Sequence, residues 1–474
     1  MKKLILLGID GASWKTIAAL VRQGEADNFK RLISRGTVGV LESTIPPESP
    51  PAWTSMFTGV NPGKHGIVDF HLFENGKFVP CFSRYQMTQS IWHLISEAGR
   101  RCIVLNNPVS YPPEQVNGLM TTGLMTPPGS DNWIYPAERK KEIDAIAQGY
   151  ECDIPPDFTE VIKRDKQAAL EMLKRLNSKH IRVGRYAAFT LEWDVLAVVL
   201  TVTDRLQHFW WDDEDKIVEF YRRIDAFLGE LIDLAESAGG ELMVVSDHGF
   251  GPCTRVVDLN ESLESLGLAL RTDSPISRIL NRMGLSRHRA KAKVGASPPW
   301  FDRLPEKLKE LVLRYVPESP EDSGRVDTLN SIAFARTKAG IFLNNEKTQA
   351  AVVSKLSSLT YEDTGEPILE KIVPREEALH GSYVYRAPHL FLQPRFGYAF
   401  GLAHSDRGIV GTHRPEGIFI HYDPNSSRAQ RDLPTPIRPW DVAATILQIA
   451  GVPIPDYFDG QPITTLEAGI LSQR

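Results

Sequence analysis

The chain has 474 residues, of which 42% are hydrophobic and 24% are charged, and its net charge is −5. This composition is typical of a globular protein, and the small negative charge gives no reason to expect a nucleic acid polymer or an anionic membrane surface as a partner. Four scattered cysteines do not predict a zinc ribbon or a disulfide framework, so we expect reduced thiols and a cytoplasmic location. The sequence has no apolar stretch of about 18 residues or more, so we expect no membrane span.

Short apolar runs without alternation recur along the chain and predict strands that are covered on both faces. These runs lie at residues 4–9, 101–106, 194–202, 241–246, 389–393 and 417–422. Segments with helical periodicity, such as residues 216–237, lie between them. Strands that alternate with helices predict an α/β fold, with a doubly wound, mostly parallel sheet and helices on both faces. In such sheets the functional groups gather beyond the carboxyl ends of the strands.

One charged and turn-rich stretch, residues 260–330, departs from this pattern and contains the basic run SRHRAKAK at 286–293. We expect a catalytic core formed by residues 1–259 and 331–474, with 260–330 as an inserted cap or lid segment. The insertion is either a solvated surface segment or a lid that offers cations to a substrate.

Six side chains of metal-ligand type stand next to the predicted strands. They are Asp10, Asp204, His208, Asp247, His248 and His413. Taken singly, an aspartate at a strand exit is commonly a helix N-cap or a turn residue. Together, however, the six are predicted to converge on one edge of one sheet, and the spacing of Asp204 and His208 places both on one helical face. Mixed carboxylate and imidazole ligands favour zinc or manganese over magnesium or calcium.

A candidate nucleophile lies in the stretch ESPPAWTSMFTG, residues 48–59. Ser49 followed by Pro50 is typical of the N-cap and the first residue of a helix. The start of a helix offers N–H groups and positive potential to an anion such as a phosphoryl group. The Ser49 hydroxyl is either a plain helix cap or a nucleophile whose pKa is lowered by a metal ion. Beside six potential ligands, we favour the nucleophile.

The motifs at these positions resemble one known family. They are LLGIDGAS, STIPPESPPAWTSMFTGVNPGKHGIVDF, TDRLQH, SDHGFG, GTHRPEGIFI and RPWDVAATILQIAGVPIPDYFDGQPI, in this order from residue 4 to about residue 462. They are similar to the type I phosphodiesterase/nucleotide pyrophosphatase branch of the alkaline phosphatase superfamily. That branch usually has threonine at the nucleophile position, where this chain has Ser49.

The resemblance implies two divalent metal ions, with Zn²⁺ favoured and Mn²⁺ as the alternative. One ion would be held by Asp204, His208 and His413, and the other by Asp10, Asp247, His248 and the hydroxyl of Ser49. His404 is a second candidate for the place of His413, but the motif HRPEG leading into a strand favours His413.

Other polar residues are weaker candidates. Asn106, Asn107 and Arg414 are predicted substrate contacts, for which turn chemistry and surface ion pairs are equally good explanations. Lys64 and His65 are expected to act as cations at the C-terminal end of the helix that begins near Ser49.

The implied activity is metal-dependent hydrolysis of phosphodiester or pyrophosphate bonds in a small phosphorylated substrate, through a covalent phospho-serine intermediate. A phosphomonoesterase, a phosphonate hydrolase and a metal-dependent phosphoglycerate mutase-like isomerase are the alternatives on the same scaffold. The isomerase would carry a large inserted domain, for which the gap between residues 59 and 204 is short. A sulfatase would have arginine where this chain has Trp53. A non-catalytic binding protein would be expected to have lost one or more of the ligands.

Overall fold

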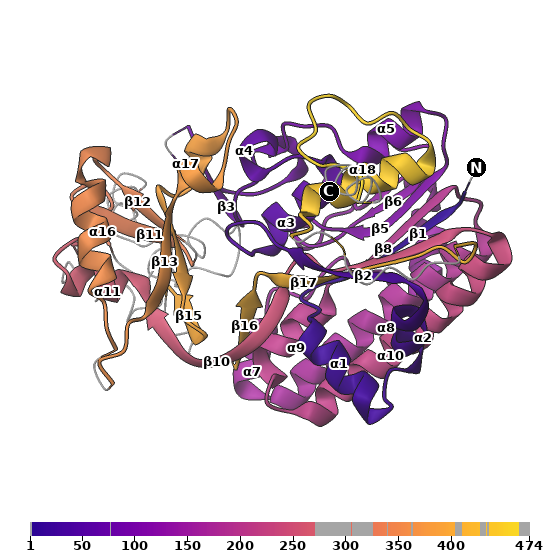
Figure 1. Cartoon of the computed structure of the whole chain (residues 1–474), viewed down its shortest axis with the longest axis horizontal. Helices are drawn as coiled ribbons and strands as arrows, with labels where there is room; N and C mark the ends of the chain where they lie inside the picture. The colour runs from indigo at the N-terminus through magenta and orange to yellow at the C-terminus, as the bar shows by residue number, and fades with distance from the viewer. Residues whose placement is uncertain are drawn as a thin grey trace, which may run out of the picture. The chain divides into compact units, whose positions relative to one another are not determined.

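The computed structural model describes residues 2–75, 77–270, 305, 326–338, 340–361, 364–402, 410–426, 433 and 436–463. The chain forms two compact units, the first made of Met1–Pro252, Glu376–Ala387 and Val410–Arg474, the second of Cys253–Arg375 and Pro388–Ile409 (Figure 1). The expected insertion at 260–330 falls in the second unit, but its residues 271–304 and 306–325 lie outside the described residues. Its role as a cap or lid stays a prediction.

The first unit is built on an eight-stranded sheet. Its order is β2 (Thr37–Glu42), β17 (Glu416–Tyr422), β9 (Glu241–Val245), β1 (Leu4–Ile9), β8 (Val195–Leu200), β5 (Cys102–Asn107), β6 (Gly118–Thr122) and β7 (Ile134–Tyr135). The five strands from β9 to β6 are parallel, whereas β17 and β7 run antiparallel to their neighbours. This arrangement confirms the predicted mostly parallel sheet.

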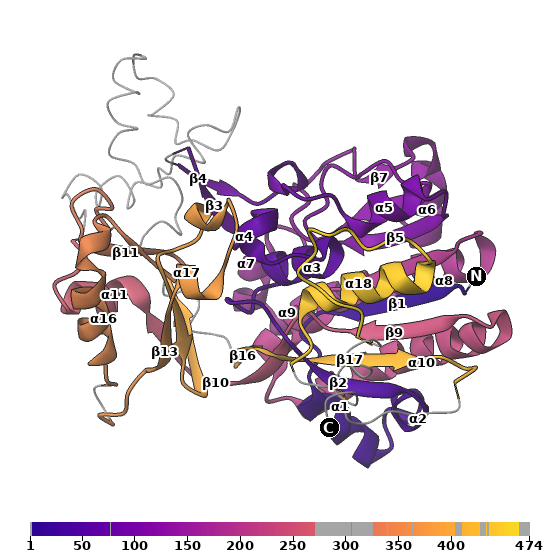
Figure 2. The same cartoon turned by 45° about the horizontal axis from the view of Figure 1, so that its top comes forward.

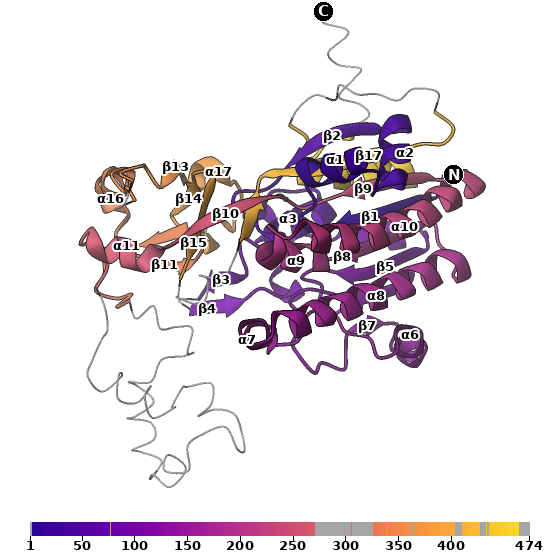
Figure 3. The same ribbon diagram turned by 90° about the horizontal axis from the view of Figure 1, so that it is seen from below.

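Helices cover both faces of this sheet, because alternate residues of each buried strand enter two separate apolar cores. Ile5 and Leu7 of β1 belong to the first core, and Leu4 and Leu6 belong to the second. The first core is covered by α1 (Trp14–Gln23), α2 (Asp27–Arg35), α6 (Lys140–Ala147), α7 (Phe158–Arg164), α8 (Lys166–Thr190), α9 (Val202–Trp210) and α10 (Glu214–Ala238). The second is covered by α3 (Ser49–Thr58), α5 (Ile91–Glu97) and α18 (Pro439–Ala450). Figure 2 shows α5 and α18 over the strands, and Figure 3 shows α8 and α10.

The first unit also contains the short helix α4 (Pro62–His65), the hairpin of β3 (His71–Glu74) and β4 (Lys77–Pro80), and the strand β16 (Gly411–Arg414). No helix within the described part of the chain is long and apolar enough to cross a membrane.

The second unit has a four-stranded antiparallel sheet with its own apolar core. The order is β11 (Ala333–Thr337), β12 (Gly340–Leu343), β14 (Leu390–Pro394) and β13 (Leu369–Pro374), accompanied by α11 (Leu259–Ser265), α16 (Gln349–Ser357) and β15 (Gly397–Gly401). The run at 389–393 therefore does not join the main sheet, and its assignment to a parallel central strand is wrong. Leu390 and Leu392 are buried in this second core, so the run has the same continuous apolar pattern as a parallel strand.

Strand register brings three chain exits to one edge of the main sheet. Ile9 of β1 is level with Leu200 of β8, and Gly8 is level with Val245 of β9. The segments that follow these strands therefore leave the sheet side by side. The strand β10 (Gly249–Asp258) begins close to this edge and pairs with β16.

Candidate functional site

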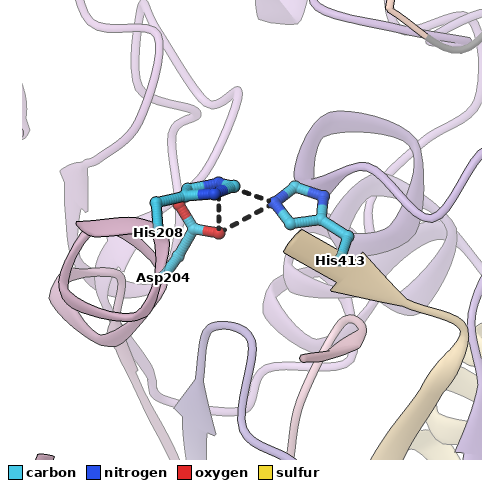
Figure 4. A group of neighbouring side chains, drawn as sticks. All are labelled: Asp204, His208 and His413. Carbon is cyan, nitrogen blue, oxygen red and sulfur yellow. Dashed lines mark hydrogen bonds and ion pairs between the residues drawn. The ribbon is translucent and has the colours of Figure 1, made fainter. Parts of the chain in front are cut away.

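Asp204, His208 and His413 form one tight group at this edge (Figure 4). Asp204 and His208 lie one turn apart on α9, as their spacing predicts, and His413 comes from β16. His413 Nε2 is 2.9 Å from Asp204 Oδ1 and 3.1 Å from His208 Nε2, and His208 Nε2 is 3.4 Å from the same aspartate oxygen. Three side chains from segments far apart in the sequence thus direct one atom each to a common point.

A second group lies beside the first and consists of Asp10, Asp204 and His248, so that Asp204 belongs to both. His248 Nε2 is 3.7 Å from Asp10 Oδ1, 4.0 Å from Asp204 Oδ1 and 3.3 Å from Asp247 Oδ2. The rings of His248 and His413 stack with their centres 3.8 Å apart. All six ligand-type residues predicted from the sequence are therefore brought together.

Backbone contacts determine which nitrogen of each ring faces the group. The Nδ1 atoms of His208, His248 and His413 lie 3.0, 3.0 and 2.9 Å from the carbonyl oxygens of Gly411, Gly249 and Pro47. A carbonyl oxygen only accepts, so each Nδ1 carries the hydrogen and each Nε2 directs a lone pair to the carboxylates and to the other rings. This is the orientation in which imidazole binds a metal ion.

Burial and mutual repulsion shift the pKa values of the acidic residues in different directions. Burial, followed by the charges of Asp247 and Asp204, raises the pKa of Asp10 well above its usual range. Burial also raises the pKa of Asp247 to about 7, although hydrogen bonds from the Gly11 N–H and from Ser49 oppose the change. Burial acts in the same direction on Asp204, but the positive charge that His208 and His413 carry when protonated outweighs it and holds the pKa of Asp204 well below its usual range.

The chemistry of this donor set fits divalent cations. Three buried carboxylates repel one another, and three Nε2 lone pairs point at them. Asp247 Oδ2 is buried without a hydrogen-bond donor among the described residues. A cation between these atoms satisfies all of them at once, whereas without a cation the site must take up protons on Asp10 and Asp247, the two carboxyl groups whose pKa values burial raises.

Ser49 lies at the start of α3 and faces the second group. Its side chain is buried, and Oγ is 3.3 Å from Asp10 Oδ1 and 3.3 Å from His248 Nε2. The predicted N-cap is wrong by one position, because Glu48 is the cap and Ser49 is the first helical residue. Since Pro50 and Pro51 have no N–H, Ser49 alone among the first three helical residues can donate a backbone hydrogen bond to an anion.

Trp53 positions Asp10 from one turn further along α3. Its indole Nε1 donates to Asp10 Oδ2 at 3.1 Å, and its ring is completely buried. A Cβ on Gly8 would lie 2.6 Å from the Trp53 ring, so the glycine in the first strand provides the space that the ring occupies. The sequence LLGID signals a strand exit but does not reveal this contact.

The weaker sequence candidates differ in their surroundings. The side-chain nitrogen of Asn106 is 2.9 Å from the carbonyl oxygen of Val199, to which it donates, and 3.3 Å from His180 Nδ1, which accounts for a structural role. Asn107 ends β5 and is 5% exposed, and its Oδ1 has no partner among the described residues. Arg414 lies on β16 next to His413 and packs against Gly251. Their contacts to a substrate stay predictions.

The remaining expectations concern His404, His65 and Lys64. His404 lies outside the described residues, so its candidacy stays a prediction. His65 is not a surface cation on a helix dipole, because it is completely buried and its Nε2 lies 2.8 Å from Ser55 Oγ. Burial lowers the pKa of His65 to about 3. Lys64 forms an ion pair with Asp459 at 2.5 Å.

Besides Trp53, sequence reasoning missed two residues that touch the predicted ligands and a third that supports one of them. Arg205 contacts Asp204, Asp153 contacts Arg205, and Glu48 Oε2 lies 3.5 Å from His413 Nδ1. Arg205 and Glu48 adjoin predicted site residues in the sequence, which is the only signal that pointed to them. Nothing in the sequence around Asp153 indicates its contact.

Comparisons with known proteins agree with this fold. The family described as type I phosphodiesterase / nucleotide pyrophosphatase matches residues 4–417. No curated protein matches the chain. Among solved structures, murine ectonucleotide pyrophosphatase/phosphodiesterase 5, in an inactive form in complex with AMP, has 14% identity and a TM-score of 0.56, with 98% of this chain and 99% of that chain covered.

Phosphonoacetate hydrolase from Sinorhizobium meliloti 1021, in complex with phosphonoformate, has 16% identity and a TM-score of 0.60, with 95% of this chain and 96% of that chain covered. The structural likeness confirms the alkaline phosphatase-like fold. Because the family match extends over most of the sequence, the chain belongs to the type I phosphodiesterase/nucleotide pyrophosphatase family, within the alkaline phosphatase superfamily.

Proposed function

We propose that this chain is a metal-dependent hydrolase of phosphodiester or pyrophosphate bonds that uses Ser49 as its nucleophile. The observation that carries the proposal is the position of Ser49 Oγ, 3.3 Å from both Asp10 Oδ1 and His248 Nε2 at the positive end of α3. The family membership supports the same class of reaction.

The proposed ligands divide into two sets. Asp204, His208 and His413 would hold one divalent cation, and Asp10, Asp247, His248 and the hydroxyl of Ser49 would hold the other. The three imidazoles and three carboxylates favour Zn²⁺, with Mn²⁺ as the alternative. When bound, such a pair of cations supplies polarisation of phosphoryl oxygens and lowers the pKa of a coordinated hydroxyl or water.

The residues of the chain account for the remaining requirements. Ser49 Oγ attacks the phosphorus, a new O–P bond forms, and the bond to the leaving oxygen breaks. The hydroxyl hydrogen has one acceptor within reach that keeps a lone pair when the cations are bound, Asp10 Oδ1, because the single Nε2 lone pair of His248 is a proposed ligand. Water then cleaves the phospho-serine, which restores the hydroxyl and releases the phosphoryl product. Ser49 is only 2% exposed, so bulk water is largely excluded from it.

Several features of the substrate and location belong to the same proposal. The substrate is a small phosphorylated molecule rather than a nucleic acid polymer, and the segment at 260–330 acts as a cap that selects it. Asn107 and Arg414 are proposed to contact it, with Asn106 as a weaker candidate. A cytoplasmic location is supported by the four cysteines, all of which have free thiols.

The test is hydrolysis of bis-p-nitrophenyl phosphate before and after removal of metal with a chelator. We expect activity to disappear on chelation and to return with Zn²⁺ or Mn²⁺. Activity that is indifferent to chelation would reject the proposal. Parallel assays with p-nitrophenyl phosphate, phosphonoacetate and p-nitrophenyl sulfate test the monoesterase, phosphonate hydrolase and sulfatase alternatives. The mutase-like alternative is disfavoured because residues 59–204 belong to the first compact unit and form no separate domain.

A further inference from the structure

Arg205 brings a permanent positive charge to the edge of the candidate metal centre. It follows Asp204 on α9, and its side chain is only 12% exposed. Its guanidinium spans two carboxylates: Nη1 is 3.4 Å from Asp204 Oδ2, and Nη2 is 3.3 Å from Asp153 Oδ2. Two separate nitrogens of one rigid, planar group are thus engaged by two acids.

The two oxygens of Asp204 consequently have different surroundings. Oδ1 is 2.9 Å from His413 Nε2 and 3.4 Å from His208 Nε2, whereas Oδ2 faces Arg205. Rotation of a carboxylate about its last torsion is loosely restrained by the covalent structure, so a partner is needed to hold one orientation. Arg205 occupies Oδ2 and leaves Oδ1 directed at the imidazoles.

The far side of this contact is anchored to another helix. Asp153 lies two residues after Glu151, whose backbone oxygen accepts a hydrogen bond from His180 Nε2 at 2.8 Å. The carboxylate of Glu151 also pairs with Lys179 Nζ at 2.6 Å. Because Lys179 and His180 belong to the long helix α8, the segment that carries Asp153 is held in place, and Arg205 with it.

The charges of the pair cancel beside the candidate metal centre. An unpaired arginine here would repel a divalent cation, but Asp153 offsets its charge. The carboxylates that face the imidazoles therefore keep their attraction for a cation. The arrangement provides orientation without adding net positive charge.

We propose that Arg205 and Asp153 form a positioning pair that holds Asp204 with Oδ1 turned to His208 and His413, and so sets the affinity of this group for a divalent cation. The proposal rests on the metal-dependent function proposed above. Neither residue touches the reacting atoms.

The test is titration of the metal-free full chain with Co²⁺, followed by visible absorption and calorimetry, in the unchanged protein and in Arg205→Met, Arg205→Lys and Asp153→Asn. Loss of a residue that orients a metal ligand typically costs about 10- to 100-fold in affinity. We expect that loss in Arg205→Met for one of the two Co²⁺ ions, and about tenfold in Asp153→Asn. Arg205→Lys should recover part of the loss, because lysine keeps the charge but cannot span two carboxylates.

The control is Arg185→Met, which removes an arginine from the exposed pair with Glu230 and should bind Co²⁺ as the unchanged protein does. Circular dichroism of the metal-free variants checks that they fold. Co²⁺ binding in both Arg205→Met and Asp153→Asn as tight as in the unchanged protein, or tighter, would overturn the positioning role alone. Failure of the unchanged protein to bind Co²⁺ would instead overturn the proposed metal-dependent function, and this inference with it.

Discussion

His413 Nε2 lies 3.1 Å from His208 Nε2. In each ring the Nδ1 atom donates a hydrogen bond to a backbone carbonyl oxygen, so the hydrogen of the ring is on Nδ1 and not on Nε2. Two imidazole nitrogens at this distance, each with its hydrogen on the other side of the ring, present lone pairs to one another. Asp204 Oδ1 adds negative charge at the same point. Such a contact is repulsive unless a cation or an added proton lies between the atoms, and burial opposes the proton by lowering the pKa of His413 to about 3.

The first prediction is that a divalent cation stabilises the folded chain. Addition of Zn²⁺ or Mn²⁺ to the chelated protein should raise the melting temperature in a thermal unfolding experiment, since a ligand at 100 times its Kd adds about 2.7 kcal/mol. His413→Asn should lose about half of the increase, because it removes the imidazole nitrogen of the first group and leaves the ligands of the second group in place. His380→Asn, an exposed histidine beside Asp459, is the control and should keep it. An equal increase in His413→Asn would contradict the prediction.

The second prediction concerns the nucleophile. Ser49→Ala removes the oxygen that lies between Asp10 and His248, and should lower kcat/KM on bis-p-nitrophenyl phosphate by a factor of about 10³ or more. Ser49→Thr keeps the hydroxyl and should retain a substantial part of the activity. Acid quenching of the unchanged protein during turnover, followed by mass spectrometry, should detect phosphate on the peptide that contains Ser49.

Metal binding separates this role from a structural one. Because Asp10, Asp247 and His248 remain, Ser49→Ala should still bind two Co²⁺ ions per chain. An alanine variant with nearly full activity would exclude Ser49 as the nucleophile. If this variant lost both metal ions, Ser49 would be needed to bind the metal ions, and the loss of activity would not identify it as the nucleophile.

The third prediction uses two tryptophans of the same core. Trp53 and Trp92 are both completely buried and both pack against Phe57, at 5.6 and 4.9 Å between ring centres. Trp53 Nε1 donates to Asp10 Oδ2, whereas Trp92 Nε1 has no partner among the described residues. Phenylalanine at either position removes a similar volume, but only Trp53→Phe leaves a buried carboxylate oxygen without its donor.

In metal-free protein, Trp53→Phe should therefore lower the free energy of unfolding by about 1–3 kcal/mol more than Trp92→Phe, as measured by chemical denaturation. It should also weaken Co²⁺ binding, because Asp10 loses the contact that orients it. Equal effects of the two substitutions on both quantities would show that the hydrogen bond from Trp53 is unimportant.

The convergence of the six ligand-type residues could be predicted because parallel strands end at one edge of a sheet. Asp10 and Asp204 follow β1 and β8, which are in register, and Asp247 follows β9. This argument needs only the strand pattern and the order of the motifs. The shared face of Asp204 and His208 could also be predicted, because it depends only on their spacing of four residues within one helix, α9.

The remaining features depend on tertiary contacts that no local pattern encodes. The run at 389–393 is buried in a second core, and burial produces the same apolar pattern in either sheet. Glu48 rather than Ser49 caps α3, a shift of one residue that short-range preferences do not resolve. Asp153 reaches Arg205 only because α8 holds its segment through Glu151.

The last prediction follows from the burial of His65. Its Nε2 lies 2.8 Å from Ser55 Oγ, and its Nδ1 accepts a hydrogen bond from the backbone N–H of Ile67 at 3.2 Å. A second proton on the ring would have to displace that N–H, in a site without water contact. Burial accordingly lowers the pKa of His65 to about 3, although the charge of Asp459 opposes the change.

In the unfolded chain His65 has a pKa of about 6.5, whereas in the folded chain its pKa is about 3. Between these two pH values the unfolded state therefore binds a proton on His65 that the folded state does not bind. The contribution of His65 to stability is thus fully present above pH 6.5 and is lost as the pH falls through this window, by about 1.4 kcal/mol per unit, or roughly 2 kcal/mol at pH 5. Chemical denaturation of metal-free protein should show His65→Gln less stable than the unchanged protein at pH 8, with the difference shrinking by that amount at pH 5. His93→Gln, whose side chain is 37% exposed, is the control and should show no such convergence. A difference between His65→Gln and the unchanged protein that stays constant from pH 8 to pH 5 would mean that His65 takes up its proton in the folded state.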